Sequence, residues 1–353
     1  MTTEILPFLK KMISLPGLSG FEGPIRNLIQ ETWAPLSDEL SVSRLGSLHA
    51  LRRGTGPAPR PSLLLSAHMD AIGLMVTGIT DEFLRVTEIG GLDPRVLPGQ
   101  MVTVHGREDL PGMIVQPASR LLPNSEQTKT VPMEHLFVDV GLLPKEVSDK
   151  VRVGDLVSFA QEPLETAGDT LAGHSLDNRA SVAVLTSFLQ ALQGHPAAWD
   201  VWAIASSQEE ETLGGAITSA FDLHPSFAIV VDVTFASSPG SPSHKTVPLG
   251  KGPTIVWGPN IHPYLFDTVK ELADRLEIPY KVEVAPRHTG TDAYGIQVVA
   301  EGIPSIVVGI PLRYMHTPVE MVMIKDITRA GRLLAEFVVG LPADFMEKMV
   351  WKD

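Results

Sequence analysis

The segment Leu63-Leu64-Leu65-Ser66-Ala67-His68-Met69-Asp70 is the stretch from which the fold is predicted most directly. Its apolar run predicts a strand that is buried on both faces, which is typical of a sheet covered by helices. After Glu165, similar runs alternate with helix-like segments along the chain. We therefore expect an α/β fold in which a mixed sheet is flanked by helices on both faces.

The expected elements follow from this alternation. Helical spacing of apolar residues predicts two N-terminal helices, divided by a turn at residues 16–20. Further helices are predicted at residues 180–192, 215–221, 263–276 and 325–340. Strands are predicted at residues 63–65, 201–205, 228–231, 280–284 and 305–309.

Residues 71–165 have a different pattern. Short β-type runs at residues 84–86, 101–104, 113–115 and 156–159 are separated by Gly, Pro and Asp, without a long helical pattern. This is typical of a small all-β barrel or sandwich. We expect it to be inserted into one discontinuous α/β domain, made of residues 1–70 and 166–353. A length of 353 residues also favours two domains.

Composition excludes several classes of protein. The net charge of −13 argues against nucleic-acid or anionic-membrane partners, because both attract clustered Lys and Arg. No apolar stretch approaches the roughly 18–20 residues that cross a bilayer, and residues 1–11 do not resemble a secretory signal. The chain has no cysteine, so a disulfide scaffold is excluded and a metal would need N and O ligands. We expect a cytoplasmic enzyme.

Five short motifs carry histidine or acidic side chains at or near the ends of predicted strands. They are Ala67-His68-Met69-Asp70, Ser175-Leu176-Asp177-Asn178-Arg179, Gln208-Glu209-Glu210, Val231-Asp232-Val233 and Tyr314-Met315-His316. Ligands of open α/β sheets bind beyond the carboxyl ends of the strands, so we expect these motifs to converge. Two imidazoles and several carboxylates suit a divalent metal when no thiolate is available. The motifs therefore predict a hydrolytic metal centre.

Each motif also has a less specific interpretation. A single histidine such as His68 or His316 is more often packed or exposed than functional, and Asp177 has the position of a helix cap. Asp232 follows an apolar run, where a buried carboxylate needs a partner. One assembled site explains the five motifs better than five separate coincidences. The charges also balance, since two divalent ions are offset by three carboxylates and a hydroxide.

The acidic neighbours of these motifs suggest a division of roles. Asp70 lies two residues after His68, on the same side of an extended chain, so its carboxylate can accept the second ring N–H. Paired glutamates are usually a solvated helix start. Glu209 and Glu210 are neighbours in an irregular turn and point in different directions, so one can bind metal while the other stays free as a base.

Longer segments resemble the tetrahedral (TET-type) aminopeptidases of metallopeptidase family forty-two. These are dinuclear metallo-aminopeptidases of the glutamyl, leucyl or lysyl type and are sometimes labelled endoglucanase-like. The resemblance covers nearly the whole chain and is carried by LPGLSGFEGPIR (15–26), SAHMDAIGLMV (66–76), SLDNRASVAVL (175–185), SSQEEETLGGA (206–216), VVDVTFASSPG (230–240), LGKGPTIVWGPNIHP (249–263), VAPRHTGTDA (284–293) and GIPSIVVGIPLRYMHTPVE (302–320). It implies a zinc-exopeptidase type of catalytic domain, interrupted at residues 71–165 by a PDZ-like β-barrel dimerisation domain. It also implies a homo-oligomer, a tetrahedral dodecamer built from dimers.

The resemblance further implies two divalent metal ions per subunit, with zinc as the first candidate and cobalt or manganese as alternatives. His68, Asp177 and Asp232 would bind one ion. Asp177, Glu210 and His316 would bind the other, so that Asp177 would bridge the two ions.

The implied reaction is hydrolysis of the N-terminal peptide bond of short peptides. Glu209 would be the general base that activates a metal-bound water, and Asp70 would orient His68. On the residues alone, a di-metal deacylase or amidase of N-acyl amino acids and a catalytically silent assembly scaffold stay open as alternatives. A polysaccharide hydrolase would use two carboxylates but has no need of the two histidines. The preferred N-terminal residue is not predicted.

Four positions depart from the family's usual pattern. Glu211 and Thr212 follow the paired glutamates in place of an aliphatic residue and Gly, Gly214 replaces a common Arg, and Phe235 replaces a common His. None of the four is an implied metal ligand. They therefore bear on substrate preference and metal affinity rather than on catalysis itself.

Overall fold

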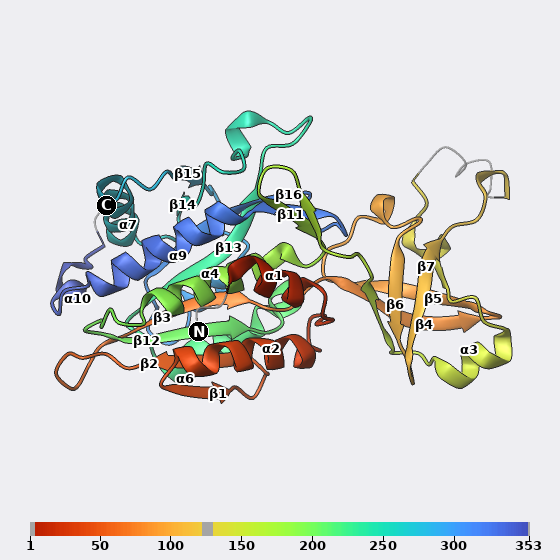
Figure 1. Ribbon diagram of the computed structural model, residues 1–353, viewed down its shortest axis with the longest axis horizontal. Coiled ribbons are helices and arrows are strands. Elements are labelled where there is room, and N and C mark those ends of the chain that lie inside the picture. Colours follow the sequence, from red (N-terminus) through yellow and green to blue (C-terminus); the bar gives the residue numbers. More distant parts are fainter. Residues whose placement is uncertain (1–3, 122–129, 352–353) are drawn as a thin grey trace.

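The computed structural model describes residues 4–121 and 130–351, which form two bodies that lie side by side (Figure 1). The larger body contains a mixed sheet flanked by helices, and the smaller body is a closed β-barrel. The prediction of an α/β fold with a mixed sheet and a small all-β part is therefore confirmed.

The mixed sheet has parallel strands at its centre. Its strands are β1 (Glu39–Val42), β2 (Leu48–Arg52), β3 (Ser62–His68), β10 (Leu164–Thr166), β11 (Thr170–Gly173), β12 (Asp200–Ser206), β13 (Phe227–Phe235), β14 (Thr254–Trp257), β15 (Lys281–Val284), β16 (Ser305–Arg313) and β17 (Glu320–Met323). They run in the order β1-β2-β12-β3-β13-β16-β17-β11-β10, and β14 lies between β16 and β15. Neighbours from β12 to β16 are parallel, so their carboxyl ends meet at one edge of the sheet.

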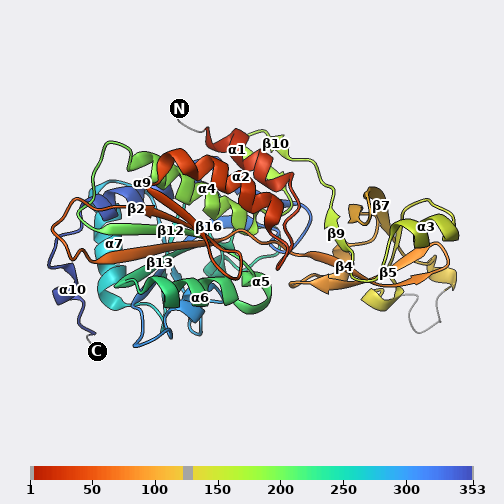
Figure 2. The same ribbon diagram turned by 90° about the horizontal axis from the view of Figure 1, so that it is seen from below.

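Helices cover both faces of this sheet (Figure 2). One layer contains α1 (Ile5–Ile13), α2 (Gly23–Trp33), α4 (Leu176–Ala191) and α9 (Ile324–Val339). The opposite layer contains α6 (Gly214–Leu223) and α8 (Asp292–Ile296), and both pack on β3. The remaining helices of this body are α5 (Glu209–Thr212), α7 (Pro263–Arg275) and α10 (Phe345–Lys348). Among the described residues, no helix combines the length and apolarity needed to cross a membrane.

The barrel has its own apolar interior. Its strands are β4 (Gly73–Thr80), β5 (Phe83–Ile89), β6 (Met101–His105), β7 (Asp109–Val115), β8 (Phe137–Asp139) and β9 (Leu156–Phe159), closed in the order β4-β5-β8-β7-β6-β9. Leu74, Val104, Ile114 and Val138 are fully buried within it. The short helix α3 (Pro144–Lys150) packs Val147 into the same interior. Alternating burial along β7 explains why its strand pattern is visible in the sequence.

The predicted helices at residues 180–192, 215–221, 263–276 and 325–340 correspond to α4, α6, α7 and α9 and are confirmed. Several outer strands, including β1, β10, β11 and β17, were not predicted. β1 and β10 are short and largely exposed, so they lack the apolar run by which the central strands are recognised.

A cluster of aromatic rings stabilises the amino end of the central strands. The Phe227 ring lies 5.7 Å from Trp199 and 5.5 Å from Phe345, and it is fully buried. We expect Phe227→Ala to lower the free energy of unfolding by about 3–5 kcal/mol, because it leaves a cavity in the core. Phe221→Ala, at a side chain that is 60% exposed, is the matched control and should change it by less than about 0.5 kcal/mol. Urea unfolding measures both; equal effects would contradict this account of the core.

Candidate metal centre

The register of three parallel strands brings the first site residues to one level. His68 ends β3 and pairs with Ser206 at the end of β12. β13 pairs with β3 as far as Ser66, so that Asp232 lies level with His68. The predicted strand end before Asp232 is wrong: β13 continues to Phe235, because it stays paired with β16 over that length.

His68 is the centre of a group of carboxylates. Its imidazole is almost fully buried, and its Nε2 atom lies 3.3 Å from Asp177 Oδ1, 3.7 Å from Glu209 Oε2 and 3.8 Å from Asp232 Oδ1. These three acids come from α4, α5 and β13. The fold therefore brings together side chains from three of the five motifs around one imidazole.

A second imidazole approaches the same aspartate from the other side. His316 lies in the turn between β16 and β17, and its Nε2 atom is 3.4 Å from Asp177 Oδ2 and 3.6 Å from Glu210 Oε2. The two oxygens of Asp177 thus face different histidines. Asp177 has non-helical backbone angles, and its carboxylate points into this cluster at the start of α4.

Asp70 connects the end of β3 with the acidic turn formed by Glu209, Glu210 and Glu211. Its buried carboxylate accepts hydrogen bonds from the backbone N–H of Glu209 (3.0 Å) and of Glu210 (3.1 Å). Its Oδ1 atom also lies 3.4 Å from Nδ1 of His68. Asp70 therefore contacts both the imidazole and the start of α5, a geometry that would suit an acid beside a histidine ligand.

Glu320 is a buried acid whose role was not predicted. It accepts hydrogen bonds from the backbone N–H of Asp177 and of His316, both at 3.0 Å, and so holds the two segments together. His316 has a positive φ of 59°, a conformation that needs support from its surroundings in a residue other than glycine. In the sequence, the only feature that marks Glu320 is that it lies four positions after His316.

Arg179 supplies a buried positive charge behind the cluster. It donates hydrogen bonds to the carbonyl oxygens of Met12, Leu15 and Met69, so it joins the end of α1 to the end of β3. Burial lowers the pKa of Arg179 to about 10, while the negative charge of Asp70 acts in the opposite direction. The guanidinium is therefore still protonated at neutral pH.

The pKa values reflect the crowding of acids around the imidazoles. Burial lowers the pKa of His68, but the carboxylates of Glu209 and Asp177 outweigh it and raise this pKa well above the ordinary value. Burial raises the pKa of Glu209 to about 9 and that of Glu210 well above its usual range. Burial also acts to raise the pKa of Asp177, but hydrogen bonds from His316 and His68 lower it to about 2. In the metal-free chain, protons held by Glu209 and Glu210 reduce the repulsion between the buried carboxylates. Bound metal cations could take the place of these protons.

The donor set fits a divalent metal ion. Two groups of three side chains, His68-Glu209-Asp232 and His68-Asp177-Glu210, each have one ligand atom per residue within 4.8 Å of one another. Buried Oε1 of Glu210 has no hydrogen-bond partner among the described residues, although such an atom normally has one. Carboxylate oxygens and imidazole nitrogens that converge in this way are ligands for zinc and its neighbours.

A cavity of about 490 Å³ opens beside this cluster. Besides the candidate metal ligands and Glu209, its walls include Leu213, Phe235, Glu283, His288 and Tyr294. It has room for an amino-acid side chain next to the candidate metal ligands. Of the residues Glu211, Thr212, Gly214 and Phe235, which the sequence analysis singled out, only Phe235 lines this cavity.

The barrel body approaches the same cluster through the segment after β5. The backbone N–H of Gly90 donates to Glu211 at 2.7 Å, so Glu211 ties this segment to the acidic turn. A Cβ at Gly91 would lie 3.1 Å from Nδ1 of His316, which shows how closely the backbone passes the ring. The two bodies therefore meet at the candidate metal centre.

Comparisons with known proteins identify the family to which this fold and sequence belong. The M42 glutamyl aminopeptidase family matches residues 46–333. A lysyl aminopeptidase of Pyrococcus furiosus is 35% identical over 96% of this chain and 98% of its own length. The crystal structure of a TET aminopeptidase from a marine sediment archaeon of the Thaumarchaeota superimposes with a TM-score of 0.93 at 30% identity, covering 98% of this chain and 99% of that one. The TET1 peptidase of Pyrococcus horikoshii gives a TM-score of 0.84 at 28% identity, covering 96% and 100%.

These matches extend over nearly the whole chain and include the part that carries the acids and histidines. They favour a peptidase over the deacylase, and an enzyme over the catalytically silent scaffold. The chain belongs to the M42 glutamyl aminopeptidase family and is a hydrolase that acts as an aminopeptidase.

Proposed function

We propose that this aminopeptidase uses two divalent metal ions, held on either side of Asp177, to remove N-terminal residues from short peptides. The observation that carries the proposal is the position of the Asp177 carboxylate, whose Oδ1 and Oδ2 atoms face His68 and His316 respectively. When bound, two such ions acidify water and polarise the scissile carbonyl.

Glu209 and Asp232 lie at similar distances from His68 Nε2, 3.7 Å and 3.8 Å, so the division of their roles follows the family resemblance. His68 and Asp232 lie on the Oδ1 side of Asp177, and we assign these three residues to one ion. His316 and Glu210 lie on the Oδ2 side, and we assign them with Asp177 to the other ion. Zinc, cobalt and manganese all accept such N and O ligands.

Glu209 is the carboxylate left over by this assignment, and we assign it the role of general base. Its side chain is 10% exposed and borders the cavity, so its Oε2 atom is within reach of a water and of a peptide. Burial raises the pKa of Glu209 to about 9 in the metal-free chain, where it holds a proton at neutral pH. Two divalent cations beside it would lower this pKa and leave the carboxylate free to accept a proton. Glu209 would accept a proton from the attacking water at Oε2 and donate it to the leaving amine.

We also propose that copies of the chain assemble through the β-barrel. The TET1 peptidase of Pyrococcus horikoshii assembles into a tetrahedron or a large octahedral shell. Residues 71–165 would then be a dimerisation domain, inserted into a catalytic domain made of residues 1–70 and 166–353, although Leu164 and Glu165 already pair in the mixed sheet as part of β10. The barrel projects away from the α/β body, where a partner could reach it (Figure 1).

The proposed base is tested by Glu209→Gln, which keeps the size of the side chain but cannot accept the proton. We expect kcat to fall at least about 100-fold while two ions still bind. Glu277→Gln, at an exposed position outside the cavity, is the matched control and should keep wild-type kcat. Turnover of an aminoacyl p-nitroanilide and elemental analysis give the two readouts. Full activity of Glu209→Gln would remove the assignment.

The bridging role of Asp177 is tested by Asp177→Asn. We expect fewer than two ions per chain after equilibrium dialysis against zinc, because the amide loses the charge that both ions would share. Asp169→Asn, at an exposed turn residue, should bind metal as the wild type does. Elemental analysis measures the stoichiometry, and two bound ions in Asp177→Asn would contradict the bridge.

The raised pKa of Glu209 predicts a pH dependence for the metal-free protein. In the folded state Glu209 keeps its proton up to about pH 9, whereas in the unfolded chain it releases the proton near the usual pKa of a glutamate. The contribution of Glu209 to the free energy of unfolding is therefore fully present at low pH. We expect the free energy of unfolding to fall as pH rises from about 5 to about 9. Thermal unfolding after treatment with EDTA measures this, and zinc should reverse the loss at high pH. A metal-free protein that becomes more stable over this range would refute the prediction.

A further inference from the structure

We infer that the cavity beside the metal centre is built for an N-terminal residue with a long, positively charged side chain, lysine or arginine, and that Glu283 pairs with that charge. This inference names the substrate class of the proposed aminopeptidase and therefore rests on the proposed function. It follows from the position of Glu283, from the charges that line the cavity, and from its exposed aromatic rings.

Glu283 reaches the face of the sheet that carries Asp232. Asp232 pairs with Gly309 of β16, and Gly309 pairs with Thr254 of β14, so the three residues form a row across the sheet. A Cβ at Gly309 would contact the Thr254 hydroxyl, which places that hydroxyl on the side-chain face that Asp232 shares. Thr254 Oγ1 then donates a hydrogen bond to Glu283 Oε2 at 3.0 Å. The Glu283 carboxylate is therefore fixed on the same face as the candidate metal ligands.

The separation suits an extended basic side chain. Asp232 and Thr254 are two strand spacings apart, which is roughly 10 Å. A peptide whose first carbonyl lies beside the Asp232 carboxylate would project its first side chain along this row. The four-carbon stem of lysine, or the longer stem of arginine, would carry its charge towards Glu283.

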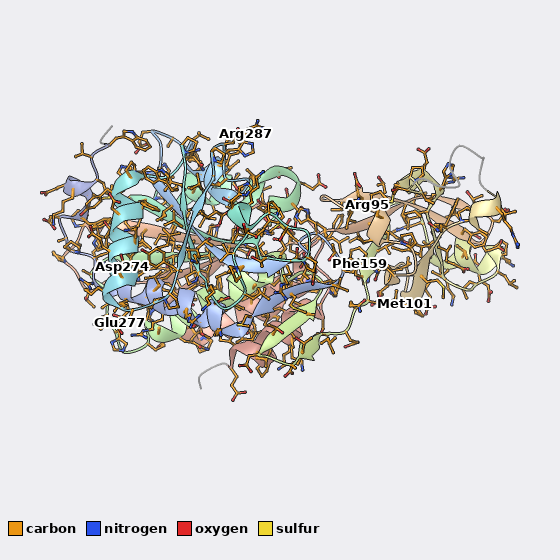
Figure 3. The ribbon with its side chains drawn as sticks, turned by 90° about the horizontal axis from the view of Figure 1, so that it is seen from above. Arg95, Met101, Phe159, Asp274, Glu277 and Arg287 are labelled. Atoms are coloured by element: carbon orange, nitrogen blue, oxygen red, sulfur yellow. The ribbon has the colours of Figure 1, made fainter. Side chains whose placement is uncertain are left out.

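Away from the candidate metal ligands, the described part of the cavity wall carries no Lys or Arg that could pair with an acidic side chain. Within the part of the chain that the structure describes, no Lys or Arg lines it, and no basic side chain lies within 4.0 Å of Glu283. Lys281 and Arg287, the basic residues nearest in sequence, are exposed and do not line the cavity, and Arg287 lies at the outer edge of the body (Figure 3). An N-terminal glutamate would place an unpaired carboxylate next to Glu283, whereas lysine would pair with it.

Aromatic rings on the cavity wall act in the same direction. The Phe235 side chain is 60% exposed and that of Tyr294 is 46% exposed, so both present open ring surface. The Tyr294 ring also packs 4.7 Å from that of His288. Ring faces attract cations and repel carboxylates, while their apolar surface accommodates an aliphatic stem. The departure at Phe235 thus favours a basic side chain over an acidic one.

The test compares lysine with norleucine, which has the same unbranched stem but no charge. With zinc-loaded wild type, we expect kcat/KM for lysyl p-nitroanilide to exceed that for norleucyl p-nitroanilide at least about tenfold, and glutamyl p-nitroanilide to be the poorest of the three. Glu283→Gln should reduce the lysine-to-norleucine ratio by roughly tenfold. Glu277→Gln removes the same charge at an exposed position two residues after α7, which does not line the cavity and lies far from Arg287 in Figure 3, and it should keep the wild-type ratio.

Binding gives a second readout that does not depend on turnover. Isothermal titration calorimetry with free L-lysine and L-norleucine should show tighter binding of lysine to the wild type, and loss of this difference in Glu283→Gln. An unchanged ratio in Glu283→Gln, or a wild-type preference for norleucine or glutamate, would overturn the inference. Absence of hydrolysis with all three substrates would instead count against the proposed function, and calorimetry alone would then decide the inference.

Discussion

An excess of carboxylates over basic side chains at the carboxyl edge of the parallel strands is the constraint on which the rest of this structure depends. The strands carry acids into the protein interior, where an unpaired charge is unfavourable. His68, His316 and Arg179 offset only part of this charge, and the raised pKa of Glu209 shows that protons offset more of it in the metal-free chain. Two divalent cations would complete the balance, so charge and proposed chemistry have the same origin.

The geometry of the centre is maintained by acids that bind backbone rather than metal. Asp70 holds the N–H groups at the start of α5, and Glu320 holds those of Asp177 and His316. In three of the four cases these contacts connect residues that are more than a hundred positions apart in the sequence. The Gly90 contact with Glu211 adds the barrel body to the same arrangement, so the position of the barrel and the shape of the site are coupled.

The sequence analysis predicted the central strands, the larger helices and the types of ligand, because each of these depends on local patterns of apolar and polar residues. It did not predict the outer strands, whose residues are partly exposed, or the extent of β13 beyond Asp232, which depends on pairing with β16. Glu320 and Arg179 carry no local signal that separates them from other charged residues. Their roles become visible only through the backbone groups that they contact.

What the sequence by itself determined is an α/β protein with no thiolate, and with histidines and carboxylates near the ends of buried strands. Only the tertiary structure decided that the two oxygens of Asp177 face different imidazoles, and that Glu283 shares a cavity with them. The physical reason is that burial and strand formation are encoded over a few neighbouring residues. Distances between side chains of different strands depend on register and packing across the whole sheet.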